Sequence, residues 1–329
     1  TNGVNTYSGT PFTVIIPANA LTFDITLTGI DDLLLDGTET ATLTLQDGAN
    51  YDLTALTADT VTLTDIDTAG ITITPTNGTT DVTEGGAVDS FTIALTSIPD
   101  QPVTITLTYN PADFLIVGDT DGSFDVVLDG TALSQIIDVQ AVEDALVEGA
   151  ENDSIAFAVS SSDTNYNLMT VTALPVSITD NDSAVIGFAL SADNVPESTT
   201  PYTINAVLTI TSVPTGGSLA APIDVVITQT PGTASTPADY TLTTLTVQFA
   251  QGAVDGASLP VGVTIANDAI DEADETFVLG FGTVTGTGTA IGTDTVTITD
   301  NDSAGITITP SGGTTDVSEG GVTDTFDVV

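Results

Sequence analysis

The sequence predicts an all-β chain of tandem antiparallel, immunoglobulin-like β-sandwiches, each of about 115–120 residues. Two observations predict this fold. Short runs alternate an apolar residue with threonine, as in residues 71–74, 103–107 and 296–299, and this period of two is typical of a strand with one buried face. Clusters of Gly, Pro, Asn and Asp separate the runs, while no stretch carries the apolar stripe of a helix. Seven or so short strands in each unit indicate a β-sandwich.

An internal repeat orders the sandwiches along the chain. Residues 68–86 and 303–321 are identical at 15 of 19 positions, and a more divergent copy begins at Ser183. Each copy follows an acidic tetrad, and the tetrads are residues 64–67, 179–182 and 299–302. Self-similarity at a fixed spacing is typical of an array of like domains.

The repeat predicts four segments. These are the C-terminal part of one sandwich in residues 1–67, complete sandwiches in residues 68–182 and 183–302, and the N-terminal strands of the next in residues 303–329. Two explanations of the partial sandwiches stay open. The chain is a window on a longer array, which we favour, or its C-terminal strands complete the N-terminal part of another copy. Both lead to a polymer, so the expected partner is the protein itself, as neighbouring repeats or as copies in a head-to-tail fibre.

The charge of the chain excludes several classes of function. It holds 45 Asp and Glu residues but no Lys, Arg or His, which gives a formal net charge of −45. Contacts to phosphate need basic side chains, so nucleic acid is excluded as a partner. No apolar run approaches the roughly 20 residues of a membrane helix, so we expect no membrane insertion. The hydrophobic share of 41% argues against disorder, and the absence of Cys excludes disulfides and thiolate metal sites.

The acidic residues recur in register between the repeats. One acidic loop recurs twice, 112 and 236 residues further along the chain. The first copy holds Asp31, Asp32, Asp36 and Glu39, the second holds Glu143, Asp144, Glu148 and Glu151, and the third holds Asn267, Asp268, Glu272 and Glu275. A solvated acidic face would explain solubility but not this register. Two carboxylates about 4 Å apart repel by about 4 kcal/mol at an effective dielectric near 20, and no basic residue offsets this. Such a cluster therefore takes up protons or binds a cation, and Ca²⁺ suits flexible acidic loops better than strictly octahedral Mg²⁺.

These motifs resemble those of the Calx-beta repeat. The matching elements of residues 68–182 are Glu84 and Gly85, Ala112, Asp113 and Phe114, Glu143 and Asp144 with Glu148 and Glu151, and the triplet Asp180, Asn181 and Asp182. Residues 183–302 repeat the pattern, except that no Gly follows Glu197 and Asn267 replaces an acid, which predicts fewer or weaker ions there. The resemblance implies Calx-beta-like sandwiches whose acidic segments meet at one pole and bind Ca²⁺.

The calcium ligands that the resemblance implies lie in every segment of the chain. They are Asp31, Asp32, Asp36, Asp65, Asp67, Glu84, Asp113, Glu143, Asp144, Glu148, Asp180, Asp182, Glu197, Asp239, Asp268, Glu272, Asp300, Asp302 and Glu319.

The function predicted from these features is structural. We expect no enzyme, because the acids of one repeat are not distinguished from those of another and no His or Lys base serves a Ser or Thr nucleophile. We expect a repeat segment of a secreted, calcium-stabilised extracellular filament or surface stalk of a prokaryote, at the cell surface or in a biofilm. An adhesin whose repeats present a tip domain is one alternative. A calcium sensor is another, although direct repetition argues against a protein that needs only one or two copies.

Overall fold

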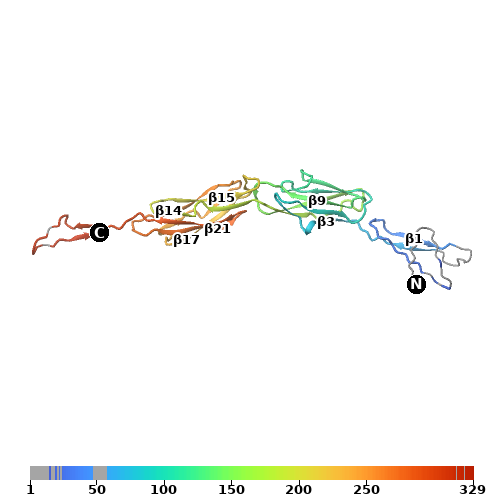
Figure 1. The fold of residues 1–329 in the computed structure, drawn as a ribbon, viewed down its shortest axis with the longest axis horizontal. Coiled ribbons are helices and arrows are strands. Elements are labelled where there is room, and N and C mark those ends of the chain that lie inside the picture. The colour runs from blue at the N-terminus through green and yellow to red at the C-terminus, as the bar shows by residue number, and fades with distance from the viewer. Residues whose placement is uncertain are drawn as a thin grey trace.

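The computed structural model of the protein describes residues 15, 19–20, 22, 24–46, 58–315, 317–321 and 323–329. It is elongated, with two sandwiches lying end to end at its centre (Figure 1). Toward the N-terminus, β1 (Glu39–Thr44) pairs antiparallel with β2 (Ala58–Leu63). At the opposite end, β24 (Ile308–Pro310) pairs antiparallel with β25 (Phe326–Val328).

The first sandwich comprises the elements from β3 to β12. Their bounds are β3 (Ile71–Pro75), the 3₁₀ turn η1 (Thr76–Gly78), β4 (Asp81–Thr83), β5 (Asp89–Leu95), β6 (Val103–Thr108), β7 (Phe114–Ile116), β8 (Ser123–Leu128), β9 (Ser134–Ala141), β10 (Leu146–Val147), β11 (Glu151–Ser161) and β12 (Leu174–Thr179). One sheet has the order β4-β12-β11-β6-β8 and the other has the order β3-β5-β9-β7. Neighbouring strands are antiparallel, except that β4 runs parallel to β12.

The second sandwich comprises the strands from β13 to β23. Their bounds are β13 (Ser183–Phe188), β14 (Ala192–Pro196), β15 (Tyr202–Thr211), β16 (Ser218–Leu219), β17 (Ile223–Pro231), β18 (Tyr240–Leu242), β19 (Thr246–Phe249), β20 (Ser258–Ile265), β21 (Glu275–Thr285), β22 (Thr289–Ala290) and β23 (Asp294–Thr299). The sheet orders are β18-β20-β15-β13-β22 and β14-β23-β21-β17-β19. The parallel pairs are β13 with β22 and β14 with β23.

Alternation along the strands builds a separate core in each sandwich. In β5, Phe91, Ile93 and Leu95 are buried, and the residues between them are half-buried. In β15, Tyr202, Ile204 and Ala206 are buried, and the residues between them are exposed. Burial of a large apolar side chain contributes about 1.5–3 kcal/mol, so these rows are the main source of stability.

The predicted all-β fold of tandem sandwiches is confirmed. Each sandwich contains more strands than the seven or so expected. The additional strands are short, like β7 and β10, and two or three residues are too few to show an alternating pattern. The residue bounds of the individual domains stay a prediction.

Candidate metal centre

Each acidic loop begins with a carboxylate that turns the chain. The side chain of this aspartate accepts a hydrogen bond from the backbone N–H two residues further on, which is an Asx turn. The three bonds, donor first, are Leu34 to Asp32 at 2.9 Å, Leu146 to Asp144 at 2.7 Å and Ile270 to Asp268 at 2.8 Å. The same local geometry therefore holds all three loops.

A second aspartate, at the end of the last strand of each repeat, ties this loop to the chain that follows. The Asp180 carboxylate accepts from the N–H groups of Glu148 and Gly149, at 2.9 and 2.7 Å, and from that of Asp182 at 2.6 Å. The other repeats show corresponding bonds. The Asp65 carboxylate accepts from the N–H groups of Gly37 and Asp67, and the Asp300 carboxylate accepts from the N–H groups of Glu272 and Asp302. These N–H groups also hold the pKa of Asp300 below its usual value.

Five predicted ligands meet at the end of the first sandwich, and we call them the junction cluster: Glu84, Asp144, Glu148, Asp180 and Asp182. One oxygen from each of Glu84, Asp144 and Glu148 lies within 4.8 Å of the others, and the same holds for Glu84, Asp180 and Asp182. Glu84 thus belongs to two groups of three. Glu84 Oε2 and Asp182 Oδ2 are buried without a hydrogen-bond partner.

The junction cluster holds more negative charge than its surroundings compensate. Burial, and then the neighbouring carboxylates, raise the pKa of Glu84 to about 7. Burial and the charge of Glu151, followed by that of Asp144, raise the pKa of Glu148 to about 7. Because the chain has no Lys, Arg or His, the compensation must come from protons or from a cation.

The second sandwich carries a corresponding set of acids, which we call the distal cluster: Glu197, Asp239, Glu272, Glu275, Asp300 and Asp302. Glu197, Asp300 and Asp302 form one group within 4.8 Å, and Asp239, Glu272 and Glu275 form another. Asp302 Oδ2 is buried without a partner. Burial, followed by neighbouring carboxylates, raises the pKa of both Glu272 and Glu275.

The N-terminal acids lie together more loosely. Burial raises the pKa of Asp67, and so do the charges of Asp65, Asp31, Asp32 and Asp36, in that order. They form no group of three within 4.8 Å among the described residues. These acids therefore lie near one another without closing around one point.

Besides the N-terminal acids, four predicted ligands stand outside the groups of three, and they are Asp113, Glu143, Asp268 and Glu319. The Glu143 carboxylate accepts from Asn181 Nδ2 at 3.1 and 3.2 Å. The Asp113 charge raises the pKa of Glu148. The Asp268 N–H donates to Glu197 Oε1 at 3.2 Å. Glu319 is exposed and lies between β24 and β25 in the sequence.

Two acids at the poles were left out of the predicted ligands. Glu275 belongs to the distal cluster, and the pKa of Glu151 is raised by burial and then by Asp113, Asp144 and Asp180. Both occupy the last position of the repeating acidic loop. That register was the signal that could have identified them.

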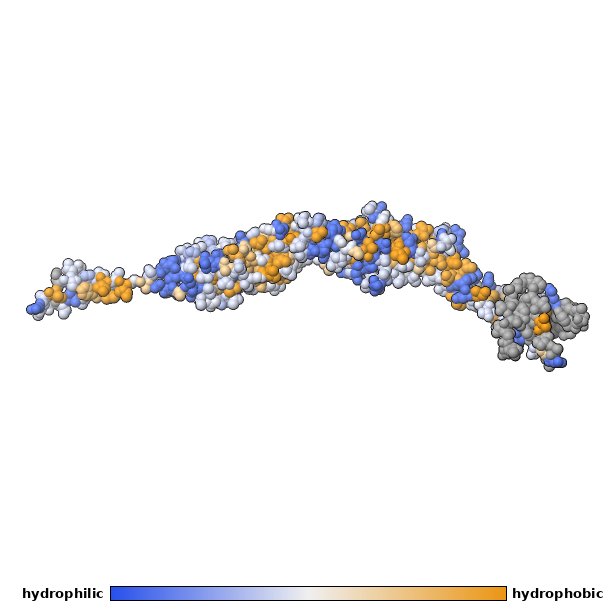
Figure 2. Space-filling view, in the orientation of Figure 1, coloured by the Kyte–Doolittle hydropathy of each residue, from blue (hydrophilic) through white to orange (hydrophobic). Residues whose placement is uncertain are grey.

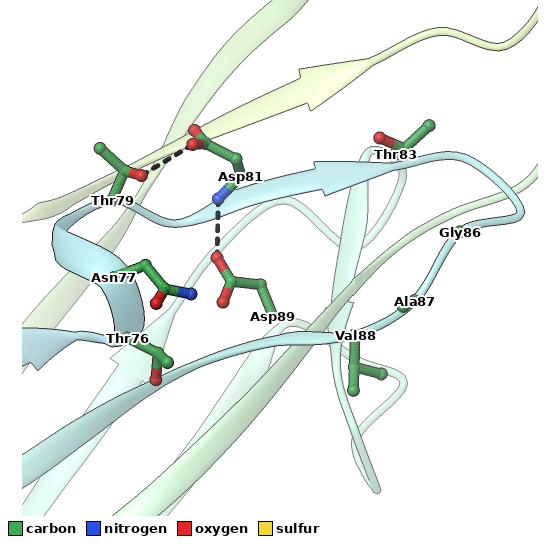
Figure 3. Close-up of a pocket in the computed structure, with 9 residues that line it drawn as sticks. All are labelled: Thr76, Asn77, Thr79, Asp81, Thr83, Gly86, Ala87, Val88 and Asp89. Carbon is green, nitrogen blue, oxygen red and sulfur yellow. Dashed lines mark hydrogen bonds between the residues drawn. The ribbon is translucent and has the colours of Figure 1, made fainter.

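A hollow of about 420 Å³ lies beside β4 and β5 rather than at a pole (Figure 3). Its two carboxylates already have local partners. Asp81 Oδ2 accepts from Thr79 Oγ1 at 2.7 Å, and Asp89 Oδ2 accepts from the Asp81 N–H at 2.9 Å. Both carboxylates of the hollow are thus already engaged, so we do not take it as a second candidate site.

The poles fit Ca²⁺. Calcium binds oxygen at about 2.3–2.6 Å, so two ligands of one ion lie at most about 5 Å apart. The oxygens of each group all lie within 4.8 Å of one another, which satisfies this limit. Buried carboxylate oxygens without partners, on Glu84, Asp182 and Asp302, are available for an ion. Hydrophilic residues gather where each sandwich ends (Figure 2).

Fold and poles together define a class: tandem β-sandwiches that carry acidic, oxygen-donor clusters at their ends. Residues 179–302 match the family model of the Calx-beta domain. The predicted resemblance to the Calx-beta repeat is therefore confirmed for this segment.

Solved structures give remote likenesses. The apo-form Calx CBD1 domain is 19% identical, with 36% of this chain and 99% of that chain covered and a TM-score of 0.32. The calcium binding domain CBD12 of CALX1.1 is 12% identical, with 68% of this chain and 99% of that chain covered and a TM-score of 0.29. The E. coli chaperone DraB is 10% identical, with 70% and 99% covered and a TM-score of 0.26. No curated protein matches the sequence.

Proposed function

We propose that this chain is a repeat segment of an extracellular filament or surface stalk, stiffened by Ca²⁺ bound at the junctions between sandwiches, and that it has no catalytic role. One observation carries the proposal: the acidic loop that supplies the candidate calcium ligands also supplies the strand that joins the next sandwich. In the described part of the chain, no helix is long and apolar enough to span a membrane.

The connection between the sandwiches is a pairing of strands. β10, which lies between Asp144 and Glu148 in the acidic loop, runs parallel to β16 of the second sandwich. The Ser218 N–H donates to the Ala145 carbonyl at 3.0 Å, and the Ala220 N–H donates to the Val147 carbonyl at 3.2 Å. Two backbone hydrogen bonds between β10 and β16 resist rotation of one sandwich against the other far better than a flexible linker would.

An apolar anchor and two further polar bonds accompany this pairing. Val147 belongs to the acidic loop of the first sandwich, yet it is only 1% exposed and packs in the core of the second. The Asp182 carboxylate accepts from the Val213 N–H at 2.8 Å, and the Glu148 carbonyl accepts from Thr287 Oγ1 at 3.0 Å. Residues of the junction cluster thus contact both sandwiches.

The preceding junction uses the same device. The Ile98 N–H donates to the Leu33 carbonyl at 2.7 Å, and Leu34 forms a parallel bridge with Ile98. Leu33 and Leu34 follow Asp32 just as Ala145 and Leu146 follow Asp144. The recurrence supports a general joint of the array.

Calcium would act on stability and on stiffness together. An ion that binds only the folded state contributes about 2.7 kcal/mol at a free concentration one hundredfold above its dissociation constant. Two such sites per sandwich amount to a large share of a typical total of about 5–15 kcal/mol. Removal of the ion would leave the acids of the junction cluster repelling one another beside β10, which loosens the joint.

The composition supports an extracellular setting. Trypsin-like proteases cleave after Lys or Arg, and the chain has neither. A polymer with this composition would persist among secreted proteases of that class.

The test compares the full chain in calcium, in chelator, and in sodium of equal ionic strength. We expect chelation to lower the melting temperature and to bend the rod at residues 180–183 in electron micrographs. We expect calcium, but not sodium, to restore both, because sodium only screens charge. Unchanged stability and straightness after verified metal removal would make the acids a solvated surface.

A further inference from the structure

Two aspartates and a tyrosine form a polar group inside the second sandwich, and we call Asp193, Tyr202 and Asp294 the interior group. Asp294, at the start of β23, is 0% exposed, and neither of its carboxylate oxygens has a hydrogen-bond partner. Asp193 lies on β14, which pairs in parallel with β23. Its Oδ2 accepts a hydrogen bond from Tyr202 Oη at 2.7 Å, and Tyr202 lies on β15 in the opposite sheet. The interior group therefore bridges the two sheets.

The strand register places both carboxylates on the inward face of one sheet. Asp193 is opposite Val296, which is buried and follows Asp294 by two residues on β23. Residues two apart on a strand share a face, so Asp193 and Asp294 are diagonal neighbours. The alternation along β14 agrees, since Asp193 and Val195 are less exposed than the residues beside them. Diagonal neighbours lie about 7–8 Å apart, so carboxylate arms between them can reach the spacing of about 5 Å that ligands of one ion require.

The members of the interior group act on one another electrostatically. Burial, followed by the charge of Asp193, raises the pKa of Asp294 to about 6. Burial raises the pKa of Tyr202, and so do its hydrogen bond to Asp193 and the charges of Asp193 and Asp294. The chain contains no Lys, Arg or His, so no side chain compensates two ionised aspartates at this place.

The first sandwich shows that the fold does not need acids here. The strand registers make Leu174 on β12 the counterpart of Asp294, and they make Thr80 the counterpart of Asp193. Both counterparts are buried and uncharged. A buried carboxylate without a partner calls for an explanation, and packing does not supply one. Strongly perturbed acids of this kind are typical of binding sites.

We propose that Asp193 and Asp294 bind a hard divalent cation between the two sheets of the second sandwich. One divalent ion neutralises two carboxylates, and carboxylate and water oxygens are the ligands that ions such as Ca²⁺ prefer. Tyr202 is a positioning residue, because its hydroxyl holds Asp193 by a hydrogen bond. Asp193 is half-buried on the edge strand β14, so the ion and its water ligands reach the site from that side.

This interior site is separate from the poles. Asp300 of the distal cluster follows Asp294 by six residues, which is about 20 Å along an extended strand. Cation binding by the interior group therefore does not depend on calcium at the poles, and the two are tested separately.

The test uses the full chain with Glu84→Gln and Glu197→Gln, which removes one ligand from each pole. Isothermal titration with Ca²⁺ in this background gives the number of ions bound. We expect Asp294→Asn to lower that number by one. Asp193→Asn should do the same, and because Asp193 is half-buried, this variant disturbs the core less. Circular dichroism checks that each variant remains folded.

Two further variants control for charge and for position. Asp224→Asn removes an acid from β17 of the same sandwich, where its carboxylate accepts from Gln248 Nε2 at 2.8 Å, and it should leave the number of ions unchanged. Tyr202→Phe keeps both carboxylates and removes only the hydroxyl. It should weaken binding at the interior site by about 10–100-fold, the usual effect of losing a group that orients a ligand.

The melting temperature distinguishes a cation from a proton. In metal-free buffer at pH 7, Asp294→Leu should melt above the native chain, and saturating Ca²⁺ should narrow or reverse the difference. A difference that changes with pH but not with Ca²⁺ would make Asp294 a protonated core carboxyl and overturn the cation site. An unchanged number of bound ions in both Asp294→Asn and Asp193→Asn would also overturn it. The poles are judged by the losses in Glu84→Gln and Glu197→Gln alone, so either proposal can fail without the other.

Discussion

Asp294 stands inside the core of the second sandwich, and replacing it with leucine should stabilise the protein. Its side chain is 0% exposed and neither carboxylate oxygen has a hydrogen-bond partner. In the first sandwich Leu174 holds this place, since Leu279 pairs with Asp294 as Ile155 pairs with Leu174. Leucine has the same branching as aspartate, with methyl groups in place of the two oxygens, so Asp294→Leu removes a buried charge without creating a cavity.

The size of this stabilisation follows from the pKa of Asp294. Burial, and then the charge of Asp193, raise the pKa of Asp294 from 3.8 to about 6, which corresponds to about 3 kcal/mol. The folded state holds this proton more tightly than the unfolded chain. The stability that Asp294 contributes is therefore full below pH 3.8 and is lost as the pH rises through about 6. At pH 7 the substitution should raise the melting temperature by about 10 °C, and at pH 4 by much less.

The assay is scanning calorimetry of the full chain at pH 4 to 7.5, with Asp224→Leu as the control. Asp224 also lies on a strand of the second sandwich, but it is half-buried and accepts from Gln248 Nε2 at 2.8 Å. We expect its loss to be neutral or mildly destabilising. If Asp294→Leu leaves the melting temperature unchanged at pH 7, or gives the same gain at every pH, the reasoning is refuted.

Three further substitutions or treatments probe other parts of the account. Gly85→Ala should destabilise the first sandwich and weaken calcium binding, because the φ of Gly85 is +62° and an added Cβ would lie 2.6 Å from Glu143 Oε2. Gly78→Ala is the control. Its φ is +92°, but nothing lies within 4 Å of an added Cβ, so this variant should leave calcium binding unchanged. Val147→Asp should lower the unfolding free energy of the second sandwich by about 2–5 kcal/mol in urea titrations, whereas Val117→Asp, at an exposed position, should have little effect. Trypsin should leave even the urea-unfolded chain intact on a gel, and any internal cleavage would contradict the absence of Lys and Arg.

Much of the fold could be predicted because its signals are repeated. Alternation with threonine marks the longer strands, and the register of the acids predicts which carboxylates share a pole, as Glu84, Asp180 and Asp182 do. The hydrogen bonds from the loop N–H groups to the Asp180 carboxylate were not predicted, because they join a backbone and a side chain that are 31 and 32 residues apart in the sequence.

The joint between the sandwiches was beyond sequence analysis for a physical reason. Leu146 and Val147 form a two-residue strand, too short for any periodicity, and their partner β16 lies in another sandwich. Asp294 was equally hidden, since an aspartate at the start of a strand usually faces water. Only the packed structure places it in the core.

The central claim is that the poles bind calcium, and isothermal titration of the metal-free chain with Ca²⁺ tests it most directly. We predict saturable binding with dissociation constants between about 10⁻⁷ and 10⁻³ M, the range of sensor and extracellular sites. Glu84→Gln should remove the binding of the junction cluster, and Glu197→Gln should weaken that of the distal cluster, while Asp138→Asn, on an exposed part of β9, should leave both unchanged. An absence of saturable binding, or equal losses in all three variants, would contradict the account.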